Sequence, residues 1–174
     1  MSDAASVAAI VVCWRTRTRS HLMTLALPLD GGCICGALRY RVTALPLAVV
    51  MCHCGNCQRR TGSAFSLAMM AWRKDFEVLS GESLACDTSG GSGAIHRQHV
   101  CPKCLTRTHT EMMAFPDIIN VRPGTLDRPR DVTPVAQVWT SVAQPWALAP
   151  DIPRFEENPI DMPKLIAEWR ERHG

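Results

Sequence analysis

Short apolar runs separated by turn-forming residues dominate the hydrophobic pattern of the chain. Six of these runs carry alternating apolar positions or β-branched residues, as strands do. Glycine, proline, asparagine and aspartate cluster between them and end each run after a few residues. The pattern predicts an all-β domain with strands within residues 37–42, 65–72, 76–79, 95–100, 117–121 and 135–139.

The end of the chain follows a different period. After Pro163, the apolar residues Leu165, Ile166 and Trp169 recur at helical spacing. Proline suits the first turn of a helix, because the N–H that it lacks has no partner there. We expect a short C-terminal helix that packs this apolar stripe on the β domain.

Residues 1–27 are predicted to form a poorly ordered N-terminal extension, followed by a single domain at 28–174. The apolar run at residues 4–14 comes before the basic residues rather than after them. That order is the reverse of a signal peptide, and the run is too short to span a bilayer. The basic segment after it would also suit organelle targeting, although it lacks amphipathic periodicity. Met23 is an alternative start that would remove nothing essential from the domain.

The composition is that of one folded, soluble domain. Of the 174 residues, 47% are hydrophobic and 20% are charged. The formal net charge of +3 and the pI of about 8.4 are low for a dedicated nucleic-acid binder. Nine cysteines without a convincing secretory signal favour metal ligation in a reducing compartment over disulfides. We therefore expect a cytoplasmic protein that binds small molecules rather than membranes or nucleic acids.

Four cysteines are spaced for a closed zinc site. Cys33 and Cys35 are two positions apart, so both side chains point to one side of an extended segment. Cys101 and Cys104 flank a knuckle whose tight turn brings two thiolates together. Two such pairs complete the four-thiolate shell of a structural zinc. This site would staple the start of the domain to its middle.

Three further cysteines, Cys52, Cys54 and Cys57, have no obvious fourth partner. Structural zinc sites usually take four protein ligands, whereas catalytic sites keep one position for water or substrate, so the spacing favours a catalytic zinc. Closure by Cys86 or His53 would instead make the site structural. His53 points to the opposite side of an extended segment, and Cys86 is expected to be buried as a small apolar residue. A redox dithiol of Cys54 and Cys57 would lack the βαβ context of that motif.

Two arginines follow the three cysteines directly. Three thiolates around one zinc dication carry a net negative charge, which Arg59 and Arg60 would stabilise. One guanidinium would also form a bidentate hydrogen bond with a substrate carboxylate. We predict Arg59 as the cofactor- or substrate-binding residue, while a solvated surface charge suits Arg60 equally well. A tight turn at residues 61–63 is predicted beside the metal.

The motifs "GGCICGALRY", "CHCGNCQRRTGSAF" and "CPKC", followed by "VRPGTLD" and "VAQVW", occur in this order. With them the chain resembles the glutathione-dependent formaldehyde-activating enzyme (GFA) family, which includes the centromere protein V relatives. The resemblance covers residues 31–146. It implies a β-tent, a fold of small coiled antiparallel sheets, with two zinc ions. The structural zinc would bind Cys33, Cys35, Cys101 and Cys104, and the catalytic-type zinc would bind Cys52, Cys54 and Cys57.

The resemblance also implies carbon–sulfur chemistry. In the family, the thiol of glutathione adds to formaldehyde and gives S-hydroxymethylglutathione. An open zinc position would hold the thiolate toward the aldehyde carbon. The same site run backwards would split the adduct, as a carbon–sulfur lyase, and the same residues are compatible with a carrier or scavenger of the adduct.

Two features near the second knuckle differ from the family or add to it. Leu105 stands where the family usually has a glycine with positive φ, which suggests an altered turn. Arg107, His109 and Glu111 alternate and are expected on one strand face. That face is either solvated, which is the preferred interpretation, or a wall of the substrate site. None of the nearby histidines is expected to be a metal ligand: His96, His99 and His109.

Two classes of function remain open from the sequence. The first is an enzyme that forms or cleaves an S-hydroxymethyl adduct of glutathione or another small thiol. The second is a non-catalytic two-zinc module that recognises a protein or a nucleic acid. An open position at the second zinc, reached by a cleft of glutathione size, favours the enzyme. A position closed by Cys86 or a histidine favours the module, and the sequence does not specify the oligomeric state.

Overall fold

The computed structural model describes residues 25–90, 93–158 and 161–174 of the chain. Most of the predicted N-terminal extension therefore lies outside the described residues. Within the described part, Leu25 is buried, and its N–H donates to the carbonyl oxygen of His173 at 3.2 Å. The chain thus enters the fold beside its own C-terminal end.

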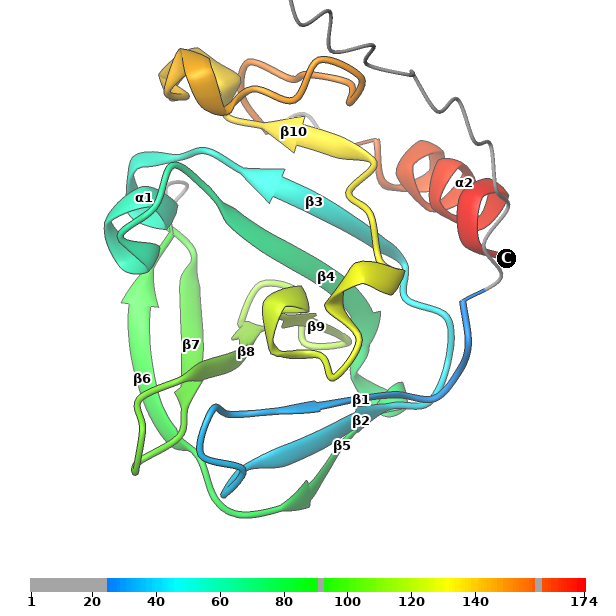
Figure 1. Cartoon of the computed structure of the whole chain (residues 1–174). Helices are drawn as coiled ribbons and strands as arrows, with labels where there is room; N and C mark the ends of the chain where they lie inside the picture. Colours follow the sequence, from blue (N-terminus) through cyan, green and yellow to red (C-terminus); the bar gives the residue numbers. More distant parts are fainter. Residues whose placement is uncertain (1–24, 91–92, 159–160) are drawn as a thin grey trace, which may run out of the picture.

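Two β-sheets of unequal size form the domain (Figure 1). The three-stranded sheet has the order β1-β2-β5 and is antiparallel. Its strands are β1 (Leu29–Gly32), β2 (Arg39–Val42) and β5 (Phe76–Ser80). The seven-stranded sheet has the order β10-β3-β4-β9-β8-β7-β6, and only its β10–β3 ladder is parallel. Its strands are β3 (Ala48–Cys52), β4 (Ser66–Trp72), β6 (Leu84–Ser89), β7 (Ile95–Val100), β8 (Arg107–Met112), β9 (Ile118–Val121) and β10 (Ala136–Val138).

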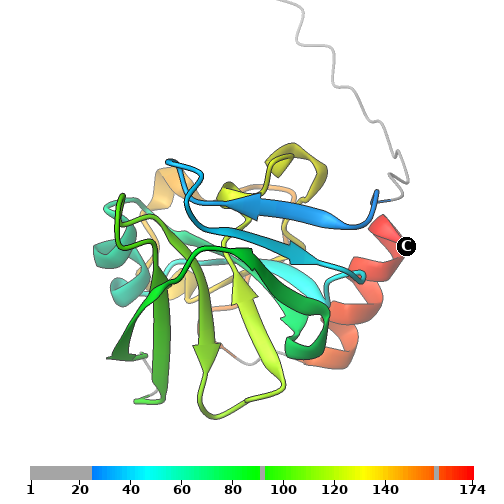
Figure 2. The same ribbon diagram turned by 90° about the horizontal axis from the view of Figure 1, so that it is seen from below.

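Two α-helices lie at opposite ends of the sheets, as Figures 1 and 2 show. They are α1 (Gly55–Thr61) and α2 (Met162–His173). Short 3₁₀ turns occur at Arg73–Asp75, Pro123–Thr125, Pro129–Asp131, Thr140–Val142 and Pro145–Ala147. No helix in the described part of the chain is long and apolar enough to cross a membrane.

The mainly β class with a short C-terminal helix is confirmed, and each of the six predicted segments contains a strand. The pattern did not reveal β3, because its residues 48–51 are all buried and no polar position alternates with them. It also did not reveal β6, whose residues are mostly exposed at the edge of the sheet. Strand β1 was missed because Asp30, Gly31 and Gly32 have the composition of a turn. Alternation identifies strands that are buried on one face, and these three strands do not show it.

The core lies between the two sheets and contains rings from both. Tyr40 and Phe76 of the smaller sheet stack with ring centroids 5.5 Å apart. Phe76 in turn contacts the ring of His109 from the larger sheet at 4.6 Å. The hydroxyl of the fully buried Tyr40 bonds to Thr125 Oγ1 at 2.7 Å, which satisfies the one polar atom of that ring. The inner face of the larger sheet is therefore closed by the smaller one.

Helix α2 adds its apolar stripe to the same core. Asp161 caps its first turn, because its carboxylate accepts the N–H of Lys164 at 3.1 Å. Leu165 and Trp169 are buried among the core residues. The predicted C-terminal helix and its packing are confirmed by these contacts.

We expect Trp169→Ala to lower the free energy of unfolding by about 3–5 kcal/mol, because the substitution leaves a large cavity under α2. The ring of Trp169 is fully buried, whereas Trp146 is 78% exposed. Trp146→Ala is the matched control, and we expect it to change stability by no more than about 0.5 kcal/mol. Chemical denaturation of the metal-loaded protein measures both. Equal losses for the two tryptophans would contradict this packing of α2.

Candidate metal centres

Four cysteines meet where the two sheets approach each other. Cys33 and Cys35 follow β1, and Cys101 and Cys104 follow β7. Their sulfur atoms lie within 4.8 Å of one another, with 3.5 Å between Cys33 and Cys35 and 3.8 Å between Cys35 and Cys101. Zinc–sulfur bonds of about 2.3 Å in a tetrahedron place the sulfurs about 3.8 Å apart. The cysteines paired by their spacing are brought together at distances that fit a metal ion.

Hydrogen-bond donors surround this four-cysteine cluster. The N–H of Leu38 donates to Cys33 Sγ at 3.3 Å, and Thr106 Oγ1 lies 3.2 Å from Cys104 Sγ. The bond from the Thr106 hydroxyl, together with nearby backbone N–H groups, lowers the pKa of Cys104 to about 5. Donors of this kind stabilise thiolates, which are the form of cysteine that binds metals.

Leu105 follows the knuckle in the left-handed conformation, with φ of 57°. Its N–H donates to the carbonyl oxygen of Cys101 at 2.9 Å, which closes the turn. The prediction of an altered turn is therefore wrong, because the leucine adopts the backbone conformation that normally favours glycine. Its side chain is 71% exposed and gains little from packing in return.

The second cluster is built by the end of β3 and the start of α1. Cys52 ends the strand, Cys54 is the N-cap residue of the helix, and Cys57 lies in its first turn. The three sulfur atoms lie within 4.8 Å of one another. Cys54 Sγ accepts the N–H of Cys57 at 3.4 Å. Hydrogen bonds from the Cys52 and Cys57 thiols lower the pKa of Cys54 to about 2.

Helix α1 was not predicted from the sequence, and it occupies the residues directly before the predicted turn. Gly62 ends the helix with φ of 62°, the usual left-handed C-terminal cap. The tight turn predicted at residues 61–63 is thus the end of this helix. Because Cys54 is the N-cap residue, an N–H group of the first turn, that of Cys57, points toward its sulfur atom.

Within the described residues, no fourth histidine, cysteine or carboxylate joins the three-cysteine cluster. Cys86 is exposed, and its sulfur contacts only the carbonyl oxygen of Asp87, at 3.9 Å. The prediction that Cys86 is buried is wrong, because β6 is the edge strand of the larger sheet and has little packed against it. His53 is fully buried, with its ring 5.5 Å from that of Phe65, and takes no part in the cluster. The cluster therefore offers three ligands and an open position.

Strand register places the three-cysteine cluster on one face of the larger sheet. Residues that are directly paired on neighbouring strands lie on the same face of a sheet. From β10 to β7, the residues that share the face of Cys52 are Val138, Cys52, Ser66, Met70, Asn120, Thr110 and Gln98. We call this the site face. The opposite face carries the residues that pack on the smaller sheet. One sheet therefore separates the core from the candidate site.

A cavity of about 220 Å³ opens on the site face beside the three cysteines. Its walls include apolar side chains, among them Met70, Phe115 and Trp139. His96 also lines it, and burial, followed by the charge of Arg60, lowers the pKa of this imidazole. His96 is therefore neutral at pH 7 and can accept a proton. Sequence reasoning did not place His96 here, although His96 lies two positions from Gln98 on β7 and therefore on the same face.

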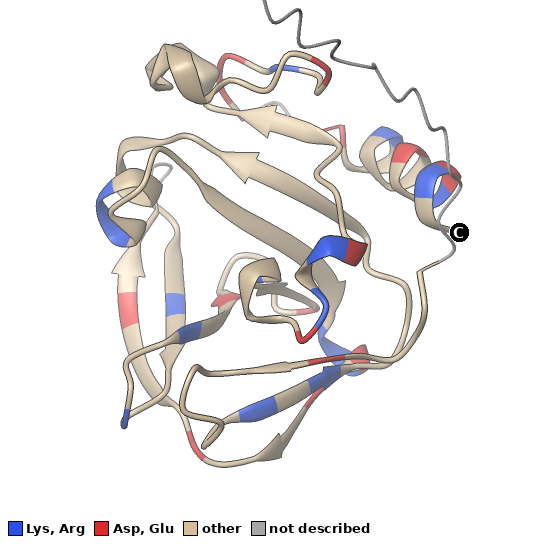
Figure 3. Cartoon of the chain, in the orientation of Figure 1, with Lys and Arg blue, Asp and Glu red and all other residues tan. Residues whose placement is uncertain are grey.

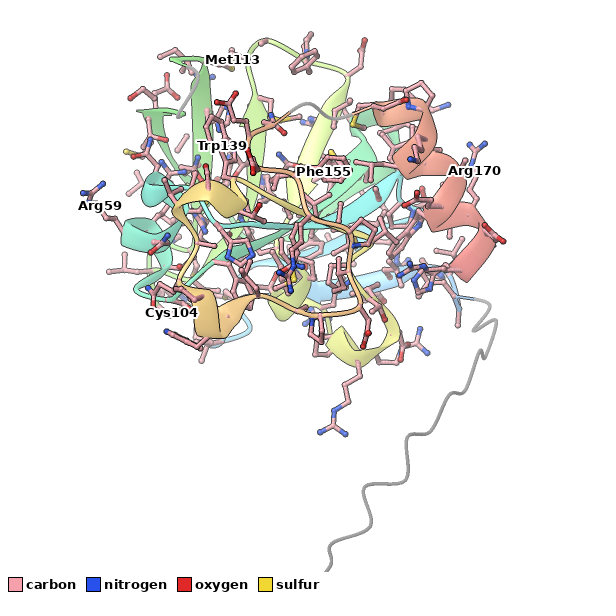
Figure 4. All side chains as sticks on the ribbon, turned by 90° about the horizontal axis from the view of Figure 1, so that it is seen from above. Arg59, Cys104, Met113, Trp139, Phe155 and Arg170 are labelled. Carbon is pink, nitrogen blue, oxygen red and sulfur yellow. The ribbon has the colours of Figure 1, made fainter. Side chains whose placement is uncertain are left out.

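Three arginines lie beside this cavity, and Arg59 is not one of them. Arg60 and Arg122 line the cavity, and Arg107 lies in the adjoining hollow. Arg59 is exposed on α1 and points away from the fold (Figure 4). It lines a separate shallow hollow with Asn56, and its role in binding stays a prediction. The position of Arg122 on the site face could have been predicted from the sequence, because Arg122 is two residues after Asn120 at the end of the predicted strand 117–121.

Arg107 and His109 lie on opposite faces of β8, so the prediction that they share one strand face is wrong. The pairing shifts between His99 and Val100, which leaves Thr108 as the extra residue of a β-bulge. Arg107 donates to Gln98 Oε1 on the site face at 3.3 Å. His109 instead stacks on His99 at 4.2 Å and is 4% exposed, so it is not on a solvated face.

Replacement of Leu105 by glycine is expected to raise the free energy of unfolding by about 1 kcal/mol, because it removes the steric cost of the left-handed backbone. Leu84, which is 57% exposed in the extended strand β6, is the matched control. Leu84→Gly is expected to destabilise the protein by about 0.5–1 kcal/mol. Denaturant titrations at saturating metal measure both changes. A loss of stability in Leu105→Gly would contradict the strained turn.

One solved structure and one family model are similar to this chain. A crystal structure of a Rhodobacter sphaeroides protein is 20% identical in sequence, with a TM-score of 0.47, and the match covers 72% of this chain and 98% of that chain. No curated protein matches the chain significantly. The model of the family described as "Glutathione-dependent formaldehyde-activating enzyme" matches residues 28–142, which include both cysteine clusters. The chain therefore belongs to the glutathione-dependent formaldehyde-activating enzyme family.

Proposed function

We propose that the protein is a zinc-dependent enzyme that joins a small thiol, glutathione in the first place, to formaldehyde, or splits the resulting S-hydroxymethyl adduct. The observation that carries this proposal is the three-cysteine cluster, which opens on a cavity of about 220 Å³ without a fourth ligand among the described residues. Family membership supports the same substrates. In this proposal the activity is of the S-(hydroxymethyl)glutathione synthase, or carbon–sulfur lyase, type.

Zinc is the metal that suits both clusters best, because thiolate-only ligand sets in tetrahedral spacing select it. Cys33, Cys35, Cys101 and Cys104 would hold one ion with a closed shell. Cys52, Cys54 and Cys57 would hold the other, which supplies a position where an external thiol loses its proton near neutral pH. The protein would therefore carry two zinc ions, one for folding and one for chemistry.

The side chains around the cavity supply the remaining requirements of the reaction. The S–H bond of the thiol breaks, a carbon–sulfur bond forms, and the carbonyl oxygen of formaldehyde gains a proton. His96 lines the cavity as a neutral imidazole, so it can take the thiol proton and return it to the new alkoxide oxygen. Apolar walls from Met70, Phe115 and Trp139 limit the access of water.

The positive charge of Arg122 acts on the thiolates from the rim of the same cavity. Burial, followed by the charge of Arg107, lowers the pKa of Arg122 to about 9, and the guanidinium remains protonated at pH 7. A cation at this place favours thiolate over thiol in the cavity. This arrangement serves chemistry at sulfur better than it serves a closed structural site.

The alternative function, a non-catalytic two-zinc module, receives less support. Such a module needs no cavity at its second metal and no open position. Basic and acidic residues are scattered over the described part of the fold without a large region of one sign, and α1 carries two arginines (Figure 3). A concentrated basic face of the kind that binds nucleic acids is not found in this part of the chain.

Cys54→Ser is expected to reduce the zinc content from two ions per chain to one, and to lower the rate of adduct formation from glutathione and formaldehyde toward the uncatalysed rate. The reason is that serine is a poor zinc ligand, while the four-cysteine cluster still holds the fold. Cys86→Ser is the matched control, since Cys86 belongs to neither cluster. Metal analysis and exchange spectroscopy by NMR measure the two effects.

Two results would count against the proposed function. One is a wild-type protein that holds two zinc ions and yet leaves the exchange between glutathione and its adduct at the uncatalysed rate. The other is a Cys54→Ser variant with unchanged activity, which would separate the activity from the three-cysteine cluster. In the first case the binding module becomes the function to pursue.

A further inference from the structure

Three guanidinium groups converge on one hollow next to the catalytic cavity. Arg60 comes from α1, Arg107 from the start of β8, and Arg122 from the residue after β9. All three line a hollow of about 350 Å³, together with Ser66 and Leu105. Arg60 and Arg122 also line the cavity of the three cysteines, so the two spaces share a wall.

Neutral groups hold these arginines in place. Arg122 donates to Ser66 Oγ and to the carbonyl oxygen of Leu67, both at 3.2 Å, and to Thr110 Oγ1 at 2.6 Å. Arg107 donates to Ser66 Oγ at 3.4 Å, in addition to its bond with Gln98. The Nε of Arg122 is buried without a hydrogen-bond partner among the described residues. The cluster is thus oriented by its surroundings but not neutralised by them.

No carboxylate of the described chain pairs with any of the three. The hollow and the cavity have no aspartate or glutamate in their walls. Elsewhere the fold does pair its arginines with carboxylates, as it does for Arg39, Arg41, Arg73, Arg97 and Arg128. The other described arginines without a carboxylate partner are all exposed, namely Arg59, Arg130, Arg154, Arg170 and Arg172, whereas the three arginines of the cluster are partly buried.

Charge counting shows that the metal centre alone does not balance the cluster. Three thiolates around a zinc dication leave one negative charge, whereas the three arginines carry three positive charges. Two positive charges remain uncompensated in a partly desolvated place, which is unfavourable unless an anion joins them. Planar guanidinium groups match the geometry of carboxylates, and here they approach from three different elements of the fold.

We propose that Arg60, Arg107 and Arg122 form a carboxylate-binding site that anchors the acidic end of the thiol substrate while its sulfur lies at the three-cysteine cluster. This inference rests on the proposed function and narrows its substrate class. The protein acts on thiols that carry carboxylates several bonds away from the sulfur, and it discriminates against neutral or basic thiols of similar size. Leu105 and Phe65 give the hollow apolar walls for the aliphatic part of such a molecule.

Two probes separate the acidic end of the substrate from its sulfur. S-methylglutathione keeps both carboxylates but has no free thiol. Glutathione dimethyl ester keeps the thiol but has no free carboxylate. Calorimetry of the zinc-loaded protein therefore measures binding to the arginine cluster with S-methylglutathione and binding to the three-cysteine cluster with the ester.

We expect S-methylglutathione to bind the wild type and to bind Arg107→Gln and Arg60→Gln about 10- to 100-fold more weakly, the usual effect of losing a charge-assisted hydrogen bond. The ester should bind all three proteins equally. Arg97→Gln is the matched control, because Arg97 pairs with Asp87 on the face of β7 opposite to the site face, and its affinities should equal those of the wild type. Arg60 lies on a helix outside the sheet, so its variant covers the case in which Arg107→Gln fails to fold.

The inference is overturned if S-methylglutathione does not bind the wild type, or if it binds the two cluster variants as tightly as it binds the wild type. It is also overturned if inorganic phosphate displaces S-methylglutathione at far lower concentration, since the hollow would then be a phosphate site. Failure of the proposed function would give a different result. In that case the ester would not bind and glutathione would not be turned over, whether or not S-methylglutathione binds.

Discussion

The four-cysteine cluster is the constraint on which the arrangement of the two sheets depends. Cys35 and Cys101 are 66 positions apart, yet their sulfurs lie 3.8 Å from each other. Cysteines after β1 and after β7 meet there, so a metal bound between them fixes one sheet against the other. The rings of Tyr40, Phe76 and His109 fill the space between the two sheets.

The same staple also shapes the candidate site. Leu105 and Arg107 lie one and three positions after Cys104. The turn at the four-cysteine cluster therefore also places an apolar side chain and a guanidinium group in the hollow beside the three cysteines. The three-cysteine cluster lies at the end of β3, on the other side of the sheet from the packed rings. One face of the larger sheet thus carries the residues of the core, and the other carries the residues of the candidate site.

The sequence allowed the cysteines to be sorted correctly into two groups, because spacing and the number of thiolates are local properties that survive without coordinates. It also revealed the strands that alternate and the helix after Pro163. It could not reveal α1, whose seven residues have no apolar face and whose start depends on Cys54 acting as a cap. Nor could it reveal the arginine cluster, since Arg60, Arg107 and Arg122 become neighbours only when three elements meet.

The bulge at Thr108 has a consequence for comparing this protein with its relatives. One extra residue reverses which side chains of β8 face the site and which face the core. An alignment that is extended through this strand without a gap will match Arg107 to core positions in any relative that lacks the bulge. Residues before Thr108 are best aligned from the knuckle cysteines, and residues after it from the pairing of Thr110 with Asn120. A single inserted residue thus decides whether the side chain at this position faces the site or the core.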